Sequence, residues 1–158
     1  MATATSTQIL ALREILIIED NEDHLELIQA ALEEAGVGNP IHTATTGQEA
    51  RAYLKECAEL AQSGARQLPC VLLLDLRLPD ASGLDILREI KQESTLHSVP
   101  VVVLTTSEDP PDIHDAYTLG ANSYLVKPIH FEEFHHKVGE AGLYWALINE
   151  PCSHVPGD

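Results

Sequence analysis

The chain has 158 residues, with 25 Asp and Glu against 9 Lys and Arg, which gives a formal net charge of −16. This balance argues against a nucleic-acid partner, because binding a phosphate backbone requires clustered cations. Since 44% of the residues are apolar, the composition is that of one globular domain and not of a disordered acidic segment. We expect a single domain over residues 13–149, with tails over residues 1–12 and 150–158.

The sequence contains no signal for export or membrane insertion. No stretch approaches 18 consecutive apolar residues, and the opening MATATSTQ lacks the basic and apolar regions of a signal peptide. We therefore expect a cytoplasmic protein without a membrane partner. Cys57, Cys70 and Cys152 form no C-x-x-C pair, so we expect three reduced thiols and neither a disulfide framework nor a zinc site.

Short apolar runs alternate five times with segments of helical periodicity, which is typical of an α/β protein with a parallel sheet. The first run, ILII at 15–18, precedes a helical segment that closes at Gly36, a residue type favoured after helix C-termini. A weaker strand at 41–44 leads into a second helix over about 48–60. The first half of the chain thus predicts two strand and helix pairs.

The second half continues this alternation. A third strand, VLLLD at 71–75, is followed by PDASG and by a helix that contains residues 84–90. A fourth strand at 101–106 leads to a helix that begins at SEDPPD, where prolines suit the first turn, and ends at 119–120. The fifth strand is SYLV at 123–126.

The last predicted helix is longer than the others. It begins near His130 and extends to Ile148, with an extension from about residue 138 and with Gly139 and Gly142 as weak points. Its apolar residues exceed what one stripe facing a core requires, so we expect something beyond the core to cover its far end.

Polar residues end the apolar runs of four strands, and all of them lie at carboxyl ends: Glu19, Asp20, Asp75, Thr105 and Lys127. We predict a doubly wound sheet of five parallel strands in the flavodoxin-like order 2-1-3-4-5. In this order the first and third strands lie side by side where ligands bind. The five side chains would then converge on one pocket.

The residue types in this predicted pocket suit phosphoryl transfer. Three neighbouring carboxylates repel one another unless they bind a hard cation, and Mg²⁺ prefers such oxygen ligands. A carboxylate beside Mg²⁺ can attack phosphorus as a nucleophile. The Lys127 ammonium and the Thr105 hydroxyl are donors for the oxygens of the transferring group.

Each of these features also has a plainer interpretation. Asp75 alone could be an ordinary polar residue at a strand end, and Glu19 with Asp20 could cap the first helix. Tyr124 could be a half-buried strand residue. The aromatic pair at 144–145 could complete the core. The ordered set at four strand ends favours the functional interpretation over these alternatives.

Four segments resemble, in order and spacing, the signature segments of response-regulator receiver domains of two-component signalling. They are IIEDN, LLLDLRLPDASG, VVVLTTS and ANSYLVKP, and the likeness covers about residues 13–137. The resemblance implies that Asp75 is the phosphoacceptor and Lys127 the phosphate-binding lysine. It also implies a Mg²⁺ site formed by Asp20, Asp75, the Arg77 backbone carbonyl and, through water, Glu19. Thr105 and Tyr124 match the switch pair of the family.

The resemblance extends to one group within this family, the stand-alone regulators of bacterial phytochrome histidine kinases. Its marks are LLLDLRLPD, PVVVLTTS and an aromatic pair ahead of NEP. It implies a histidine kinase as partner, an unidentified downstream protein, and a homodimer through the face of the fourth helix, fifth strand and last helix. We expect that face to include Tyr117, Phe134, Tyr144 and Trp145.

Two other classes of function remain open at this point. A Mg²⁺-dependent phosphohydrolase with an aspartyl nucleophile usually has a second Asp two residues after the first, and Arg77 occupies that position here. A pseudo-receiver that acts only as a docking protein would lack part of the acidic pair or the lysine. We therefore expect a phosphoacceptor and not an enzyme, in which Arg77 holds the phosphoryl group or pairs with Glu108 and slows hydrolysis.

Overall fold

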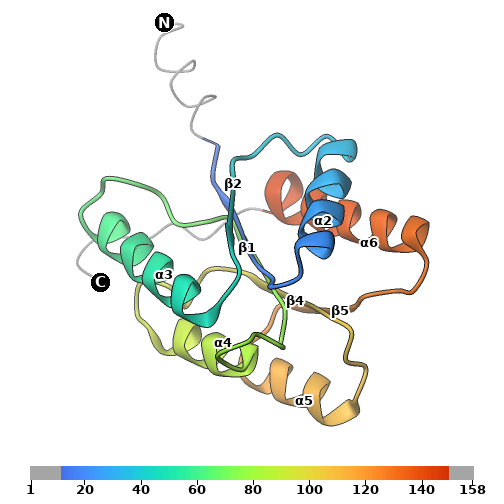
Figure 1. The fold of residues 1–158 in the computed structure, drawn as a ribbon. Coiled ribbons are helices and arrows are strands. Elements are labelled where there is room, and N and C mark those ends of the chain that lie inside the picture. The colour runs from blue at the N-terminus through green and yellow to red at the C-terminus, as the bar shows by residue number, and fades with distance from the viewer. Residues whose placement is uncertain (1–11, 150–158) are drawn as a thin grey trace, which may run out of the picture.

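The computed structural model describes residues 12–149, which form one five-stranded parallel sheet in the order β2-β1-β3-β4-β5 (Figure 1). The strands are β1 (Ile15–Ile18), β2 (Ile41–Ala44), β3 (Val71–Leu74), β4 (Val101–Thr105) and β5 (Ser123–Val126). The predicted fold class and strand order are confirmed. Apart from Leu12, both predicted tails lie outside the described residues.

Helices cover both faces of the sheet. They are α2 (Glu22–Glu34), α3 (Gly47–Gln62), α4 (Gly83–Gln92), α5 (Pro110–Thr118) and α6 (Phe131–Leu143), followed by a π-helical turn, η1 (Tyr144–Ile148). In Figure 1, α2 and α6 lie together on one side of the sheet, and α3, α4 and α5 lie on the other. None of the described helices is long and apolar enough to cross a membrane.

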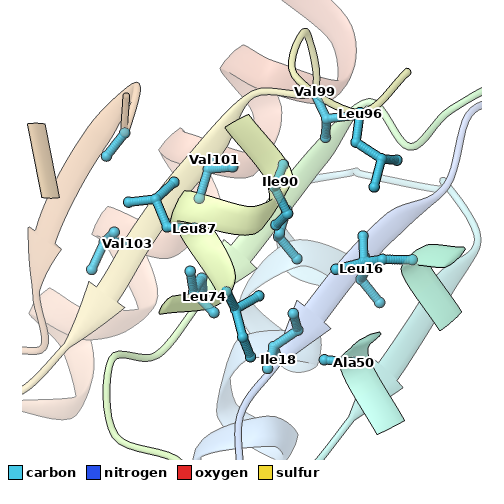
Figure 2. Packing of buried hydrophobic residues seen from close by; sticks show 14 of the residues in the cluster. Leu16, Ile18, Ala50, Leu74, Leu87, Ile90, Leu96, Val99, Val101 and Val103 are labelled. Carbon is cyan, nitrogen blue, oxygen red and sulfur yellow. The ribbon is translucent and has the colours of Figure 1, made fainter. Parts of the chain in front are cut away.

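Alternate residues of the central strands point to opposite faces, and both sets are apolar because both faces are covered. On the side of α3, α4 and α5, Leu16, Ile18 and Leu74 pack with residues of α4 such as Leu87 (Figure 2). On the other side, Ile15, Ile17, Val71 and Leu73 pack against α2 and α6. Because the strands are apolar on both faces, a charged side chain can reach solvent only where each strand ends.

The register of β1 and β3 brings their ends to the same level of the sheet. Ile18 pairs with Leu74, so the next residues of the two strands, Glu19 and Asp75, emerge side by side. The Asp75 backbone N–H donates to the Ile18 carbonyl at 3.0 Å and extends the pairing by one step.

The last helix differs from the sequence prediction in two ways. Gly139 and Gly142, predicted as weak points, are buried within α6 where it packs on α2, and a Cβ atom at Gly139 would lie 3.2 Å from the Ala35 Cβ. Their lack of side chains permits this close approach, so packing between helices outweighs their low helix propensity. Phe134 is only 4% exposed and belongs to the core, so its predicted place on the homodimer face is wrong.

The loop between β3 and α4 closes tightly around Gly83. The Gly83 N–H donates to the Leu76 carbonyl at 2.8 Å. An added Cβ at Gly83 would overlap the Asp75 carbonyl oxygen and come 2.7 Å from the Leu76 Cα. Both neighbours are backbone atoms, which cannot move aside as a flexible side chain can.

We predict that Gly83→Ala lowers the free energy of unfolding by about 1–3 kcal/mol, because the new methyl group forces the backbone after Asp75 to shift. Gly38→Ala is the matched control, since a Cβ at Gly38 has no atom within 4 Å. Its effect should stay below about 1 kcal/mol. Urea unfolding of both variants checks the prediction, and equal stability of the two would contradict it.

Candidate functional site

Three carboxylates gather at the carboxyl edge of the sheet, as predicted. One oxygen each from Glu19, Asp20 and Asp75 lies within 4.8 Å of the others. Glu19 and Asp75 are buried, at 2% and 7% exposure, whereas Asp20 is exposed. Oxygen donors of this kind fit a hard divalent cation such as Mg²⁺, which would be bound on its protein side and open to water on the other.

The start of α2 fixes the inward direction of Glu19. Asn21 caps the helix, and its side-chain oxygen accepts from the N–H groups of Asp23 and His24 at 2.9 and 3.1 Å. The Asn21 N–H in turn donates to Glu19 Oε1 at 3.2 Å. Asn21 therefore caps the start of α2 and also holds the Glu19 carboxylate in place.

Lys127 joins the ends of three strands through its ammonium group. Its Nζ donates to Glu19 Oε2 at 2.6 Å and to Asp75 Oδ2 at 2.9 Å, and lies 2.9 Å from His24 Nδ1. Its backbone N–H donates to the Thr105 carbonyl at 2.7 Å. The described residues contain no cis peptide bond, so the lysine reaches the site with a trans bond before Pro128.

The two carboxyl groups that share Lys127 have opposite pKa shifts. Burial raises the pKa of Glu19 to about 7, against the partial compensation of Lys127. Burial also acts to raise the pKa of Asp75, but the Lys127 charge and the Arg77 N–H outweigh it, and the net pKa is lowered. Asp75 is therefore the carboxyl that stays ionised, as a nucleophile must.

The loop after Asp75 is held at several points. The Arg77 N–H donates to Asp75 Oδ1 at 3.0 Å, and this leaves Oδ2 to Lys127. Farther along, the Asp80 carboxylate accepts from the N–H groups of Gly47 and Gln48 at 2.6 and 2.9 Å, which lowers the pKa of Asp80. These bonds tie the loop to the first turn of α3.

Thr105 and Tyr124 are connected through one residue of the loop between β4 and α5. The Tyr124 hydroxyl donates to the Ser107 carbonyl at 2.8 Å, and the Ser107 N–H lies 3.5 Å from the Thr105 hydroxyl. The Ser107 hydroxyl also bonds Asp112 of α5 at 2.5 Å. Thr105 is fully buried and Tyr124 is half-buried. Because both side chains contact Ser107, a movement of either one would change its contacts with Ser107.

Sequence reasoning missed two residues of this site. His24 contacts Lys127, and Asp80 secures the loop after Asp75. No local pattern marks His24, because Asp20 precedes α2 and the partner of His24 is 103 residues away in the sequence. The hypothesis that Arg77 pairs with Glu108 finds no support among the described residues, since no ion pair joins them, and its role toward a phosphoryl group stays a prediction.

The site draws acidic groups, a hydroxyl and a lysine from four strands to one edge of a parallel sheet of order 2-1-3-4-5. This combination defines a receiver domain of two-component signalling. Residues 15–139 match the family model described as the response regulator receiver domain, and the chain belongs to this family.

Similar proteins include regulators from two other organisms. The chain is 43% identical to the probable methanogenesis regulatory protein FilR2 of Methanothrix harundinacea, over 83% of this chain and 82% of that protein. It is 34% identical to the response regulator Rcp1 of Synechocystis, over 83% and 87% respectively.

Solved structures agree with this picture. The phosphorylated cyanobacterial phytochrome response regulator RcpA superposes with a TM-score of 0.80 at 36% identity, over 90% of this chain and 100% of that chain. The Mn²⁺-bound form of Rcp1 has a TM-score of 0.79 at 30% identity, over 89% and 99%. The chain is thus related to phytochrome-associated response regulators in both sequence and structure.

The raised pKa of Glu19 predicts how stability depends on pH in protein kept metal-free by a chelator. Between the ordinary pKa of 4.5 and about 7, native Glu19 holds a proton that the unfolded chain has released. Its stabilising effect is complete below the lower value and is lost as pH rises through the upper one. From pH 5 to 8 we expect a loss of roughly 1–3 kcal/mol from this group.

Urea unfolding of the wild type and Glu19→Gln across this range checks the prediction. Stability should fall less with rising pH in the variant, which has no carboxyl at this position. His24 has a lowered pKa, chiefly through burial, and acts in the opposite direction, but both proteins contain it. The same pH dependence in both would contradict the assignment to Glu19.

Proposed function

We propose that this chain is a response regulator that accepts a phosphoryl group on Asp75 from a histidine kinase and transmits the change to a partner protein. The observation that carries the proposal is the position of Asp75. It is a buried carboxylate at the end of β3, bonded to Lys127 and close to two further carboxylates. The family has this general behaviour, and FilR2 and Rcp1 match this chain over most of their lengths, which supports a regulator of the stand-alone type.

The chemistry follows from the contacts of Asp75. With Oδ1 held by the Arg77 N–H, Oδ2 is the oxygen that faces the lysine and would attack phosphorus. An O–P bond forms as the P–N bond of a kinase phosphohistidine breaks, and the imidazole leaves with the electron pair. Lys127 then turns its N–H groups toward the phosphoryl oxygens, and the Thr105 hydroxyl donates to another.

Mg²⁺ is the proposed cofactor of this step. Its ligands would be Asp20, Asp75, Glu19 through water and the Arg77 backbone carbonyl, and it would supply positive charge beside the phosphoryl oxygens. The oxygen donors in the carboxylate cluster support this assignment, and so does the Mn²⁺-bound form of Rcp1.

The proposed signal is a population shift along the chain of contacts through Ser107. A phosphoryl group on Asp75 would draw the Thr105 hydroxyl inward. This would disturb Ser107, to which the Tyr124 hydroxyl and Asp112 of α5 are bonded. The surface formed by α5, β5 and α6 would change, and a partner that binds this surface would respond to phosphorylation.

An apolar surface beside Asp75 suits the kinase. A pocket of about 310 Å³ next to Lys127 is lined by residues of α2, the β4 end, the segment between β5 and α6, and α6 itself: His24, Leu27, Thr106, Lys127, Pro128, Ile129, Phe131 and Phe134. Ile129 at its rim is 98% exposed, which is unusual for an isoleucine. We propose that the kinase segment with the phosphohistidine docks here, and that a phytochrome-type kinase is the donor, in line with RcpA and the phytochrome-associated relatives.

Exposed apolar side chains on α5 and on η1 suit a homodimer. Tyr117 on α5 is exposed, as are Tyr144, Leu147 and Ile148 of η1, while Trp145 is half-buried and packs edge-on against Tyr144. With Phe134 assigned to the core, the proposed contact moves toward the far end of the last helix. A second copy would cover these side chains along with the half-buried strand β5.

We predict that acetyl phosphate with Mg²⁺ adds one labile phosphoryl group to the protein, detected as a gain in intact mass. Asp75→Asn should show no gain, and the control Asp85→Asn, which alters an exposed carboxylate on α4, should still be modified. Catalytic turnover of phosphate esters would favour the hydrolase instead, and no modification at all would favour the pseudo-receiver.

The same mass measurement tests the kinase surface. Ile129→Asp should slow transfer from a phosphorylated phytochrome-type kinase at least several-fold, because it places a charge on the apolar contact. Its uptake from acetyl phosphate should stay unchanged, since a small donor needs no docking surface. Equal rates from the kinase for the wild type and Ile129→Asp would contradict the proposed surface.

Light scattering over a range of concentrations tests the dimer. We expect a mass that rises toward two chains in the wild type and stays at one chain in Tyr144→Asp/Ile148→Asp, because two buried charges oppose association. Ile129→Asp, on the other apolar surface, is the control and should dimerise normally. A constant monomer mass for the wild type, with and without phosphorylation, would exclude the dimer.

A further inference from the structure

The Lys127 ammonium has three N–H groups, and the structure surrounds it with three acceptors. Two of them, Glu19 Oε2 and Asp75 Oδ2, belong to the carboxylates discussed above. The third is His24 Nδ1, at 2.9 Å. Neither the sequence motifs nor the proposed chemistry gives His24 any role.

The chemistry of the lysine defines the state of this histidine. An ammonium group only donates, so Nδ1 must accept and the ring proton must lie on Nε2. The distance from Nδ1 to Glu19 Oε1 is 3.6 Å, too long for a hydrogen bond, and this leaves Lys127 as the polar partner of Nδ1. Burial and the Lys127 charge lower the pKa of His24, in agreement with a neutral ring.

His24 is also well placed to remain a partner when the carboxylates cannot. Once Asp75 carries a phosphoryl group, its oxygens no longer offer the lysine a full negative charge, and a cation at Glu19 would compete for that carboxylate. The His24 backbone is held in the first turn of α2, where its N–H donates to Asn21 Oδ1 at 3.1 Å. From this position the ring offers the lysine an acceptor outside the carboxylate cluster.

We propose that His24 is a positioning residue of the phosphorylation site, which directs the Lys127 ammonium toward the incoming phosphoryl group by accepting one of its hydrogen bonds through Nδ1. This inference rests on the proposed function. Without the acceptor, the long lysine side chain samples more rotamers and spends less time in the productive direction.

Three substitutions at position 24 separate this role from simple packing. The amide oxygen of His24→Asn can replace Nδ1, whereas His24→Gln places its oxygen near the position of Nε2, and His24→Leu has no acceptor. We expect initial phosphorylation rates with acetyl phosphate and saturating Mg²⁺ to fall roughly five- to tenfold in the Leu and Gln variants. The Asn variant should stay within about twofold of the wild type.

A matched control and a double-mutant cycle complete the experiment. His136→Leu removes an exposed histidine that pairs with Glu140, far along α6, and should leave the rate unchanged. In a Lys127→Met background, His24→Leu should cause no further loss, because the group it acts through is gone. Urea unfolding of each variant identifies any that loses rate because it is less folded.

Nitrogen NMR of the imidazole gives a readout that does not depend on activity. We expect the Nε2–H tautomer of His24 in the wild type and a mixture of tautomers in Lys127→Met. If the wild type is phosphorylated and His24→Leu matches its rate, the inference is overturned while the proposed function stands. If the wild type takes up no phosphoryl group, the proposed function falls as well.

Discussion

One positive charge, on Lys127, holds together two buried carboxylates that follow two other strands of the sheet. Glu19 follows β1 and Asp75 follows β3, whereas the lysine follows the edge strand β5. Burying either carboxylate without a partner would be costly, and one ammonium for two carboxylates leaves the cluster with excess negative charge when both are ionised. Burial raises the pKa of Glu19, and the neighbouring Asp75 charge adds to this effect. The excess negative charge also favours binding of a second cation.

The sheet makes this arrangement possible because its register places charged side chains only at the carboxyl ends of the strands. The strands β1, β3 and β4 are buried on both faces, and a slip of one residue would move Glu19 or Asp75 into the apolar interior. The bond from the Asp75 N–H to the Ile18 carbonyl fixes the two strand ends at the same level. The apolar run before Asp75 therefore sets the position of the carboxylate along the strand.

Reasoning from the sequence succeeded where one strand or one strand end decides the outcome. The runs at 15–18 and 71–74 define buried strands by themselves, and the order of polar residues after them predicted the cluster. It failed where two helices meet. Helix propensity predicts weak points at Gly139 and Gly142, and the sequence pattern places Phe134 on a surface. Which side of α6 faces α2 depends on their contact, and local periodicity does not reveal it. His24 belongs to the same class, since its partner is 103 residues away.

The helices α5 and α6 are packed to different extents, and this suggests where a change at Asp75 would be transmitted. The contact between α6 and α2 is close and glycine-dependent, with Val138 and Phe134 buried beneath it. In contrast, α5 has Ala116 as its buried residue and is bonded through Asp112 to Ser107. A loosely packed helix shifts at lower cost than an interlocked pair. If phosphorylation draws Thr105 inward, we therefore expect α5 and Tyr124 of β5 to move relative to α6, which stays packed on α2, so that the surface shared by α5, β5 and α6 changes.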